Sequence, residues 1–245
     1  MDRPLDEIRE FFEPYNGLEL DYYLDPLGPT ASEKQRRLRK QSIHHLARYQ
    51  WAAMVLDATP PGAILDAGCG AGYGAFVLAR SLPGHTIVGG DTDSRAIEFA
   101  RQKYGTLPNL EFVHFDIESW RIGEDKRAPS FAHILAFDTL EQVAHRDIAL
   151  VNMAESLNRD GMLLLSTPCK SENLLHPSWE HHRIEYSAAY LQNLLRRFFG
   201  TVLVPQHVDF PHASFWTDVV NRGETRYLLR ANPLVCRDPL AFGLS

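Results

Sequence analysis

The amino-acid sequence predicts an α/β fold built around a mostly parallel sheet with helices packed against it. Short apolar runs alternate with amphipathic helical stretches through the middle of the chain, which is the pattern of parallel strands joined by right-handed crossovers. Three of these runs end in aspartate, at Asp66, Asp91 and Asp116. Because ligands of such sheets bind outside the carboxyl ends of the strands, the three aspartates mark the predicted binding site.

The first apolar run leads into the most informative stretch, residues 63–74, which reads AILDAGCGAGYG. It predicts a strand, a glycine-rich turn and the start of a helix. Glycine permits positive φ and lets a ligand approach the backbone closely, and the helix start adds free N–H groups. The glycines also fit the loose dinucleotide-binding pattern. However, Asp66 would then point a carboxylate at a pyrophosphate, so we favour a ligand that carries cationic groups.

The other elements are expected in sequence order. Hydrophobic periodicity predicts further strands over 86–90, 110–115, 130–137 and 162–166, and helices over 94–104, 146–158 and 188–198. Ser94 or Asp93 can cap the first of these helices. Beyond Phe198 we expect strands over 202–204 and 226–229, with an aromatic insertion between them over 210–216.

The N-terminal residues 1–58 are expected to form an arm and a helix ahead of a domain over residues 59–245. Residues 1–30 are rich in aromatic and acidic side chains, and Thr30 to Glu33 have the pattern of a capping box. The helix that begins there should run to about Asp57, before two prolines and a glycine. A lid over the binding site and a packed arm are both open interpretations. Five basic residues over 34–40 indicate either a solvated helix face or an anionic partner.

Composition limits the classes of function. The 245 residues suit one α/β domain with additions, and the net charge of −6 argues against a general nucleic-acid partner. No apolar run is long enough to cross a membrane, and the N-terminus is not expected to be a signal peptide. Three widely spaced cysteines, Cys69, Cys169 and Cys236, fit a reducing cytoplasm. Monomer and homodimer are both left open.

Five motifs over about residues 45–200 together resemble the class I S-adenosylmethionine-dependent methyltransferases. Residues 66–72 are similar to the family's D-x-G-x-G-x-G motif, residues 87–94 to its second-strand motif, and residues 112–117 to its adenine-binding turn. Residues 137–143 resemble the segment after the fourth strand, with Gln142 in place of the usual histidine. Residues 157–162 resemble the turn before the fifth strand, with Asp160 in place of proline. The resemblance implies a Rossmann-like, seven-stranded sheet in the order 3-2-1-4-5-7-6, with the last strand antiparallel and helices on both faces.

The resemblance also implies which residues bind S-adenosylmethionine, and hence its product S-adenosylhomocysteine. Asp66 would hold the ammonium group, and Asp91, beside Thr92, would accept both ribose hydroxyls. The residues expected to contact the methionine part, the adenine and the region of the methyl group are Gly68, Cys69, Gly70, Asp116, Ile117 and Phe137. Arg48 or Tyr49 could meet the cofactor carboxylate, although an ion pair on the helix surface is the alternative for Arg48.

Methyl transfer to a hydroxyl or an amine often requires removal of a proton. His182, followed by Tyr186 and Ser187, resembles a family element beside the acceptor pocket, so it is the candidate general base. A structural hydrogen bond that anchors the loop is the alternative role for His182. His207 and His212 are further candidates for acceptor contacts. The histidines and acids over 172–182 fit no standard metal-ligand spacing, so we expect no metal.

The function expected from the sequence is methyl transfer to a small molecule, with a sugar-containing or other natural-product acceptor favoured by the resemblance. A peptide, lipid or quinone acceptor is one alternative. A cofactor-binding regulatory protein without catalysis is another.

Overall fold

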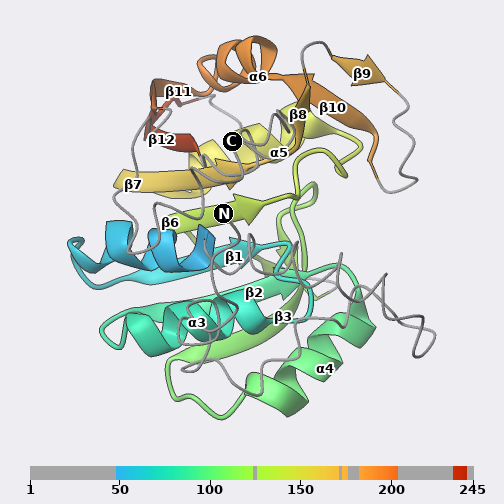
Figure 1. Cartoon of the computed structure of the whole chain (residues 1–245). Coiled ribbons are helices and arrows are strands. Elements are labelled where there is room, and N and C mark those ends of the chain that lie inside the picture. The colour runs from blue at the N-terminus through green and yellow to red at the C-terminus, as the bar shows by residue number, and fades with distance from the viewer. Residues whose placement is uncertain (1–47, 124–125, 171–172, 176–181, 204–233, 242–245) are drawn as a thin grey trace, which may run out of the picture.

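The structure is a computed structural model that describes residues 48–123, 126–170, 173–175, 182–203 and 234–241. The expected arm and most of the N-terminal helix lie outside the described residues, which include only the helical residues 48–57. Figure 1 shows a large twisted sheet crossing the molecule, with helices packed against both of its faces. The predicted α/β class is therefore confirmed.

Nine strands form the large sheet within the described residues. Their bounds are β1 Ala63–Ala67, β2 Thr86–Asp91, β3 Leu110–Asp116, β4 Arg121–Ile122, β5 Lys126–Arg127, β6 Phe131–Phe137, β7 Leu157–Ser166, β11 Phe199–Leu203 and β12 Leu234–Pro239. A smaller sheet has the order β8-β10-β9, with β8 Cys169–Lys170, β9 Leu174–Leu175 and β10 Ile184–Ser187. The first five predicted strands correspond to β1, β2, β3, β6 and β7, so the sequence located the parallel part of the sheet correctly.

The order of the longer strands is β3-β2-β1-β6-β7-β12-β11. The strands from β3 to β7 pair in parallel, whereas β12 is antiparallel to both β7 and β11. This is the order implied by the resemblance. The number of strands needs a correction, because the short strands β4 and β5 form an antiparallel hairpin on the β3 edge.

Two predicted boundaries are wrong near β7. The helix expected to reach residue 158 is α5, Arg146–Ser156, and the turn expected over 157–161 is already part of β7. Leu157 pairs with Phe131 across an irregularity in the ladder before the regular pairing of β6 with β7 begins. The extra pairing thus extends the strand toward its start. The sequence also missed β12, and the strand expected over 226–229 lies outside the described residues.

The other helices are α3 Tyr73–Ser81, α4 Ser94–Tyr104 and α6 Ala188–Leu195. The cap of α4 is Asp93, whose carboxylate accepts a hydrogen bond from the backbone N–H of Arg95. Ser94, the other candidate, is the first helical residue. Ser187 caps α6 in the same way through Tyr190. Side-chain oxygens are favoured at these positions because the first N–H groups of a helix have no partner within it.

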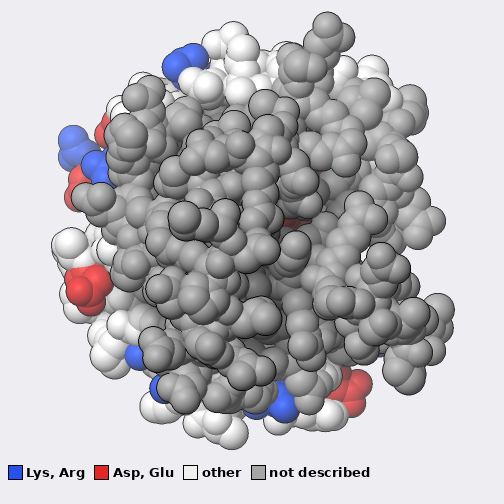
Figure 2. All heavy atoms as spheres, viewed as in Figure 1, with Lys and Arg blue, Asp and Glu red and all other residues white. Residues whose placement is uncertain are grey.

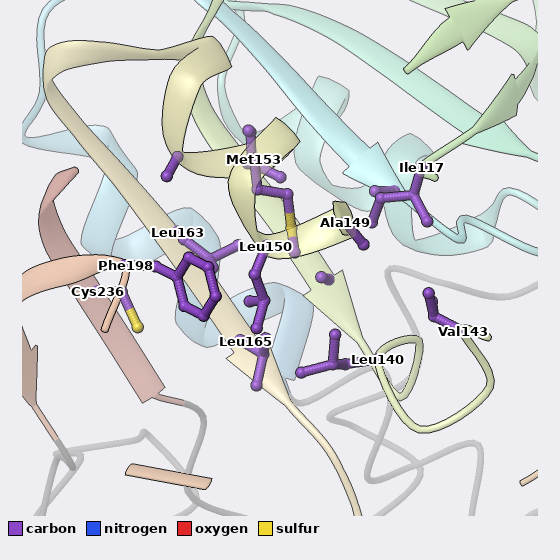
Figure 3. Close-up of a cluster of buried hydrophobic side chains, with 14 of the residues drawn as sticks. Ile117, Leu140, Val143, Ala149, Leu150, Met153, Leu163, Leu165, Phe198 and Cys236 are labelled. Atoms are coloured by element: carbon purple, nitrogen blue, oxygen red, sulfur yellow. The ribbon is translucent and has the colours of Figure 1, made fainter. Parts of the chain in front are cut away.

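Alternating side chains of the central strands supply two hydrophobic cores, one on each face of the sheet. Leu65 of β1 and Leu163 of β7 belong to one core, together with α5 and α6. Figure 3 shows Leu150 of this core, on α5, close to Leu163 and Leu165. Ile64, the neighbour of Leu65, belongs to the other core, with α3, α4 and the helix over 48–57. The helical residues 48–57 are therefore part of the packed domain.

Candidate functional site

The predicted site begins where β1 ends and the chain turns into α3. Three glycines of this loop have positive φ, with values of 85° at Gly68, 55° at Gly70 and 86° at Gly72. The N–H groups of Gly68 and Cys69 donate to the carbonyl of Gly90, at 2.8 and 3.0 Å. The glycine loop is thereby fixed to the end of β2, beside Asp91. We use the term glycine loop for residues 68–72.

Close packing explains why glycine is needed at Gly68 and Gly72. A Cβ at Gly68 would overlap the side chain of Thr139, and a Cβ at Gly72 would overlap Ala100 and Phe112. Thr139 also donates from its hydroxyl to the carbonyl of Ala67, at 2.9 Å. The segment after β6 therefore lies directly against the glycine loop.

Asp66, at the end of β1, is completely buried. The Tyr49 hydroxyl donates to its Oδ1 at 3.1 Å, while Oδ2 has no hydrogen-bond partner in the described part of the chain. Burial raises the pKa of Asp66 to about 7, against the smaller lowering effect of the Tyr49 bond. An orphaned, buried carboxylate oxygen of this kind fits a cationic group of a ligand, because a charge–charge contact would satisfy it.

Asp91 lies at the end of β2, where it binds two backbone N–H groups. Gly70 donates to its Oδ2 and Asp93 donates to its Oδ1, both at 2.9 Å. Burial raises the pKa of Asp91, and these two N–H groups act in the opposite direction. The side chain is only partly buried, so each oxygen keeps acceptor capacity toward a ligand at the glycine loop.

Asp116 forms a similar turn at the end of β3. Its carboxylate accepts from the N–H of Glu118 and from the hydroxyl of Ser119, both at 2.9 Å. Ile117 is buried between them, and Asn152 of α5 donates to the carbonyls of Ile117 and Glu118. Three strand ends thus present Asp66, Asp91 and Asp116 along one edge of the sheet, as the sequence predicts.

Aromatic rings pack between the N-terminal helix and the end of β6. The ring of Tyr49 meets Phe137 edge-on with centroids 5.2 Å apart, and Tyr73 at 6.0 Å. Phe137 is 5% exposed, and the Arg48 guanidinium lies 5.8 Å from its ring centroid. The Phe137 side chain is accordingly a core contact at this edge, and its predicted role near a cofactor methyl group stays a prediction.

Arg48 forms a buried ion pair that the sequence did not predict. Its guanidinium donates to both carboxylate oxygens of Asp138, at 2.7 and 2.9 Å, and also to the Ser166 hydroxyl. Burial alone would lower the pKa of Arg48, but the pair with Asp138, together with Tyr73 and Tyr49, raises it overall. The alternative of an ion pair on the helix surface therefore needs correction, because the Arg48 side chain is 0% exposed.

Asp138 is the site residue that sequence reasoning missed. It follows β6 with a φ of 53°, a left-handed conformation that is uncommon for a residue other than glycine and is enriched at functional sites. Its N–H donates to the carbonyl of Ser166, and its own carbonyl accepts from Gln142. The signal in the sequence was its position, since it is a fourth acid directly after a strand.

His182 is buried between two carboxylates. Its Nδ1 lies 3.2 Å from Glu185 Oε1, and its Nε2 lies 3.7 Å from Glu141 Oε1. The His182 side chain is 1% exposed. Glu141 is itself buried and accepts from the Thr167 hydroxyl at 2.8 Å. Buried contacts of this kind are more typical of a histidine that anchors a loop than of a general base open to an acceptor. The catalytic role of His182 stays a prediction.

Cys69 contributes its backbone N–H to this geometry, not its side chain. The Cys69 thiol is buried, which raises its pKa well above the usual range. The predicted acceptor contacts His207 and His212 lie outside the described residues, as do most of the histidines and acids over 172–182. Within the described ranges, no group of three or more histidine, cysteine or acidic side chains could hold a metal ion, and no helix is long and apolar enough to cross a membrane. In the view of Figure 2, most of the basic and acidic side chains that can be seen are interspersed around the rim.

Comparison with known proteins finds similarity to methyltransferases. Residues 65–163 match the family model described as "Methyltransferase domain". The chain is 30% identical over 107 residues to the malonyl-[acyl-carrier protein] O-methyltransferase of Halalkalibacterium halodurans. The matched region covers 44% of this chain and 39% of that relative. It is 29% identical over 113 residues to the trans-aconitate 2-methyltransferase of Delftia acidovorans, covering 46% and 40%. The chain thus spans about two fifths of the length of these relatives.

Among solved structures, the chain is similar to the 1,6-didemethyltoxoflavin-N1-methyltransferase of Burkholderia thailandensis, a structure with bound 1,6-didemethyltoxoflavin and S-adenosylhomocysteine. The TM-score is 0.54 at 20% identity, over 87% of this chain and 92% of that one. The two chains therefore share a Rossmann-like fold. Together with the family match over residues 65–163, this similarity supports the resemblance of the chain to the class I S-adenosylmethionine-dependent methyltransferases.

Proposed function

We propose that this chain is an enzyme that binds S-adenosylmethionine and transfers its methyl group to a small molecule. The observation that carries the proposal is the glycine loop, which is bracketed by acids at the ends of three adjacent strands. Asp66 offers an orphaned oxygen suited to an ammonium group, and Asp91 offers a partly exposed carboxylate suited to a ribose diol. Asp116 and the adjoining backbone of Ile117 suit an adenine.

In this proposal the cofactor supplies the reactive sulfonium and the methyl group, so the protein has to bind and align. The backbone of Gly68, Cys69 and Gly70 would lie along the methionine part, with Thr92 beside the ribose. Asp66 would neutralise the ammonium. The bonds from Gly68 and Cys69 to Gly90 support this role, because they hold the loop in one conformation before any ligand arrives.

For the acceptor we propose a small molecule that presents an oxygen or a nitrogen nucleophile. The names of the curated relatives support a carboxyl-bearing acceptor, since malonyl-[acyl-carrier protein] and trans-aconitate carry such groups. The name of the structural neighbour, an N1-methyltransferase with bound 1,6-didemethyltoxoflavin, supports a nitrogen acceptor. Within this class we propose a sugar-containing acceptor. The fold alone does not select among carboxyl, nitrogen and sugar-containing acceptors.

The test begins with calorimetric titration of the whole chain with S-adenosylmethionine, S-adenosylhomocysteine and NAD. We expect micromolar binding of the first two compounds and no binding of NAD. Asp91→Asn should weaken S-adenosylhomocysteine binding by about 1–3 kcal/mol, because a charge-assisted hydrogen bond is lost. The matched control is Asp93→Asn, two residues away, which keeps a capping side chain on α4. Binding of NAD alone would contradict the proposal.

Methyl transfer is then measured with labelled S-adenosylmethionine against carboxylic acids, hydroxyl compounds and amines. Transfer to one class identifies the nucleophile. Binding of both adenosyl compounds without transfer to any acceptor would instead support the cofactor-binding regulatory protein.

A further inference from the structure

The turn after β6 contains two acidic side chains, and each of them contacts one hydroxyl and one nitrogen-bearing side chain. We call residues 138–141 the β6 turn. Its two acids, Asp138 and Glu141, each accept a hydrogen bond from a hydroxyl at the carboxyl end of β7. Ser166 bonds Asp138 at 3.3 Å, and the next residue, Thr167, bonds Glu141 at 2.8 Å. Consecutive residues of one strand end therefore hold both ends of the turn.

Each acid also faces a nitrogen-bearing side chain from a distant segment. Asp138 pairs with Arg48 of the N-terminal helix, and Glu141 faces His182, which precedes β10. All of these side chains are largely buried. The β6 turn is thus where the N-terminal helix, β7 and the segment that leads into β10 meet.

The backbone reinforces the contact on the His182 side. The N–H of Arg183 donates to the carbonyl of Glu141 at 2.8 Å, and the Arg183 guanidinium donates to the carbonyl of Gln142 at 3.1 Å. On the other side of the turn, Thr139 bonds the carbonyl of Ala67 and packs on Gly68. A shift of the turn would therefore displace the glycine loop as well.

We propose that His182 and Glu141 are positioning residues for methyl transfer, whose buried pair fixes the β6 turn against the glycine loop. In this role His182 does not itself take a proton from the acceptor. The inference rests on the proposed function and assigns the two residues a part in it. Alignment of the nucleophile with the methyl group is the main task of such an enzyme, and a misplacement of 1 Å costs about a hundredfold in rate.

The surroundings of the imidazole support positioning over proton removal. Glu141 faces one ring nitrogen and Glu185 faces the other. The His182 side chain is 1% exposed, so neither ring nitrogen is open to an acceptor molecule. Burial, with the charge of Asp138 adding to it, raises the pKa of Glu141, while Thr167 and Arg48 act in the opposite direction. Three charged side chains therefore surround the His182–Glu141 pair: Asp138 of the β6 turn, Arg48 of the helix over 48–57, and Glu185 of β10.

The first test is hydrogen exchange of the whole chain, measured by mass spectrometry, which needs neither cofactor nor acceptor. We expect faster exchange in peptides that contain the β6 turn and Arg183 in His182→Gln and in Glu141→Gln. The double variant should exchange no faster than the worse single variant, because the two residues act as one pair. The matched control is His145→Gln, which alters an exposed histidine paired with Glu118 at 2.5 Å. Unchanged exchange in both single variants would overturn the proposal.

The second test separates positioning from proton removal and uses whichever acceptor the wild-type chain methylates. His182→Gln and Glu141→Gln should each lower kcat roughly tenfold or more, whereas the Kd for S-adenosylhomocysteine should rise by a smaller factor because the glycine loop is displaced only indirectly. The pH profile of kcat should keep its shape. Loss of the low-pH limb in His182→Gln alone would identify His182 as the base and overturn the proposal. A wild-type chain that transfers no methyl group counts against the proposed function, whereas the exchange result still decides the pairing.

Discussion

The two halves of the carboxyl edge of the sheet are built differently. In the half formed by β1, β2 and β3, each strand-end acid bonds residues close in the sequence: Tyr49 is 17 positions from Asp66, and Gly70 is 21 positions from Asp91. In the half formed by β6 and β7, the partners are farther away. Thr167 is 26 positions from Glu141, and Arg48 is 90 positions from Asp138.

The chemical partners differ as well. Asp91 accepts from two backbone N–H groups, and Asp116 accepts from one backbone N–H and from the hydroxyl of Ser119, three residues along the chain. Asp138 and Glu141 hold side chains, which only particular residues can supply. We infer that the half formed by β1, β2 and β3 is held in place by contacts within neighbouring loops. The half formed by β6 and β7 instead joins segments that are far apart along the chain. Four predictions test this difference, from the largest expected effect to the smallest.

Breaking the Arg48–Asp138 pair should have the largest effect on stability. Arg48→Met leaves Asp138 as a largely buried carboxylate without its partner, and we expect a loss of roughly 3–5 kcal/mol in the free energy of unfolding. The control is Arg95→Met, because Arg95 pairs with Asp93 at 2.9 Å while its side chain is 81% exposed. That pair should contribute about 0–1 kcal/mol. Urea denaturation measures both losses, and similar values would remove the contrast between buried and exposed pairs.

A side chain at Gly68 should disturb both halves together. Gly68→Ala combines a positive φ with overlap of Thr139, so we expect a loss of about 1–3 kcal/mol and weaker binding of S-adenosylhomocysteine. Gly123→Ala measures the cost of a positive φ without steric overlap. Gly123 has a φ of 66°, and a Cβ at this position would meet no atom within 4 Å. The double variant Gly68→Ala/Thr139→Ala should recover part of the loss. No recovery would mean that the contact with Thr139 is irrelevant.

The buried Asp66 makes stability depend on pH. The folded chain keeps the Asp66 proton up to about pH 7, whereas an unfolded chain releases it near pH 4, as at an ordinary aspartate (~3.9). Between these values the folded state binds more protons, so its stability falls as the pH rises. From pH 5 to pH 7 we expect Asp66 to contribute a loss of about 1–2 kcal/mol. Asp66→Asn should flatten this dependence in urea denaturation, and exposed Glu111→Gln should leave it intact.

The smallest effect is expected from Asn152, the long-range contact of the first half. Asn152→Ala removes two hydrogen bonds to the backbone that adjoins Asp116. We expect about 0.5–1.5 kcal/mol of lost stability and a modest weakening of S-adenosylhomocysteine binding by calorimetry. The exposed Gln102→Ala on α4 is the control. A loss as large as that of Arg48→Met would show that the first half also depends on distant side chains.

Sequence reasoning located most of what local patterns encode. Strands β1, β2, β3 and β6 and helix α4 were placed to within one residue, because apolar periodicity and turn residues act over short distances. The acids at the ends of β1, β2 and β3 were found for the same reason. The start of β7 was wrong, since pairing with Phe131 extends the strand in a way that the sequence of β7 does not encode.

The sequence by itself determined the class of fold, the glycine loop and the three aspartates, because each depends on residues close together along the chain. Only the tertiary structure decided the fate of Arg48, Asp138, Glu141 and His182. Each of these side chains is charged or polar and would ordinarily be solvated at the surface. Their burial is tolerated because they meet partners up to 90 positions away, and such pairings exist only once the sheet has assembled.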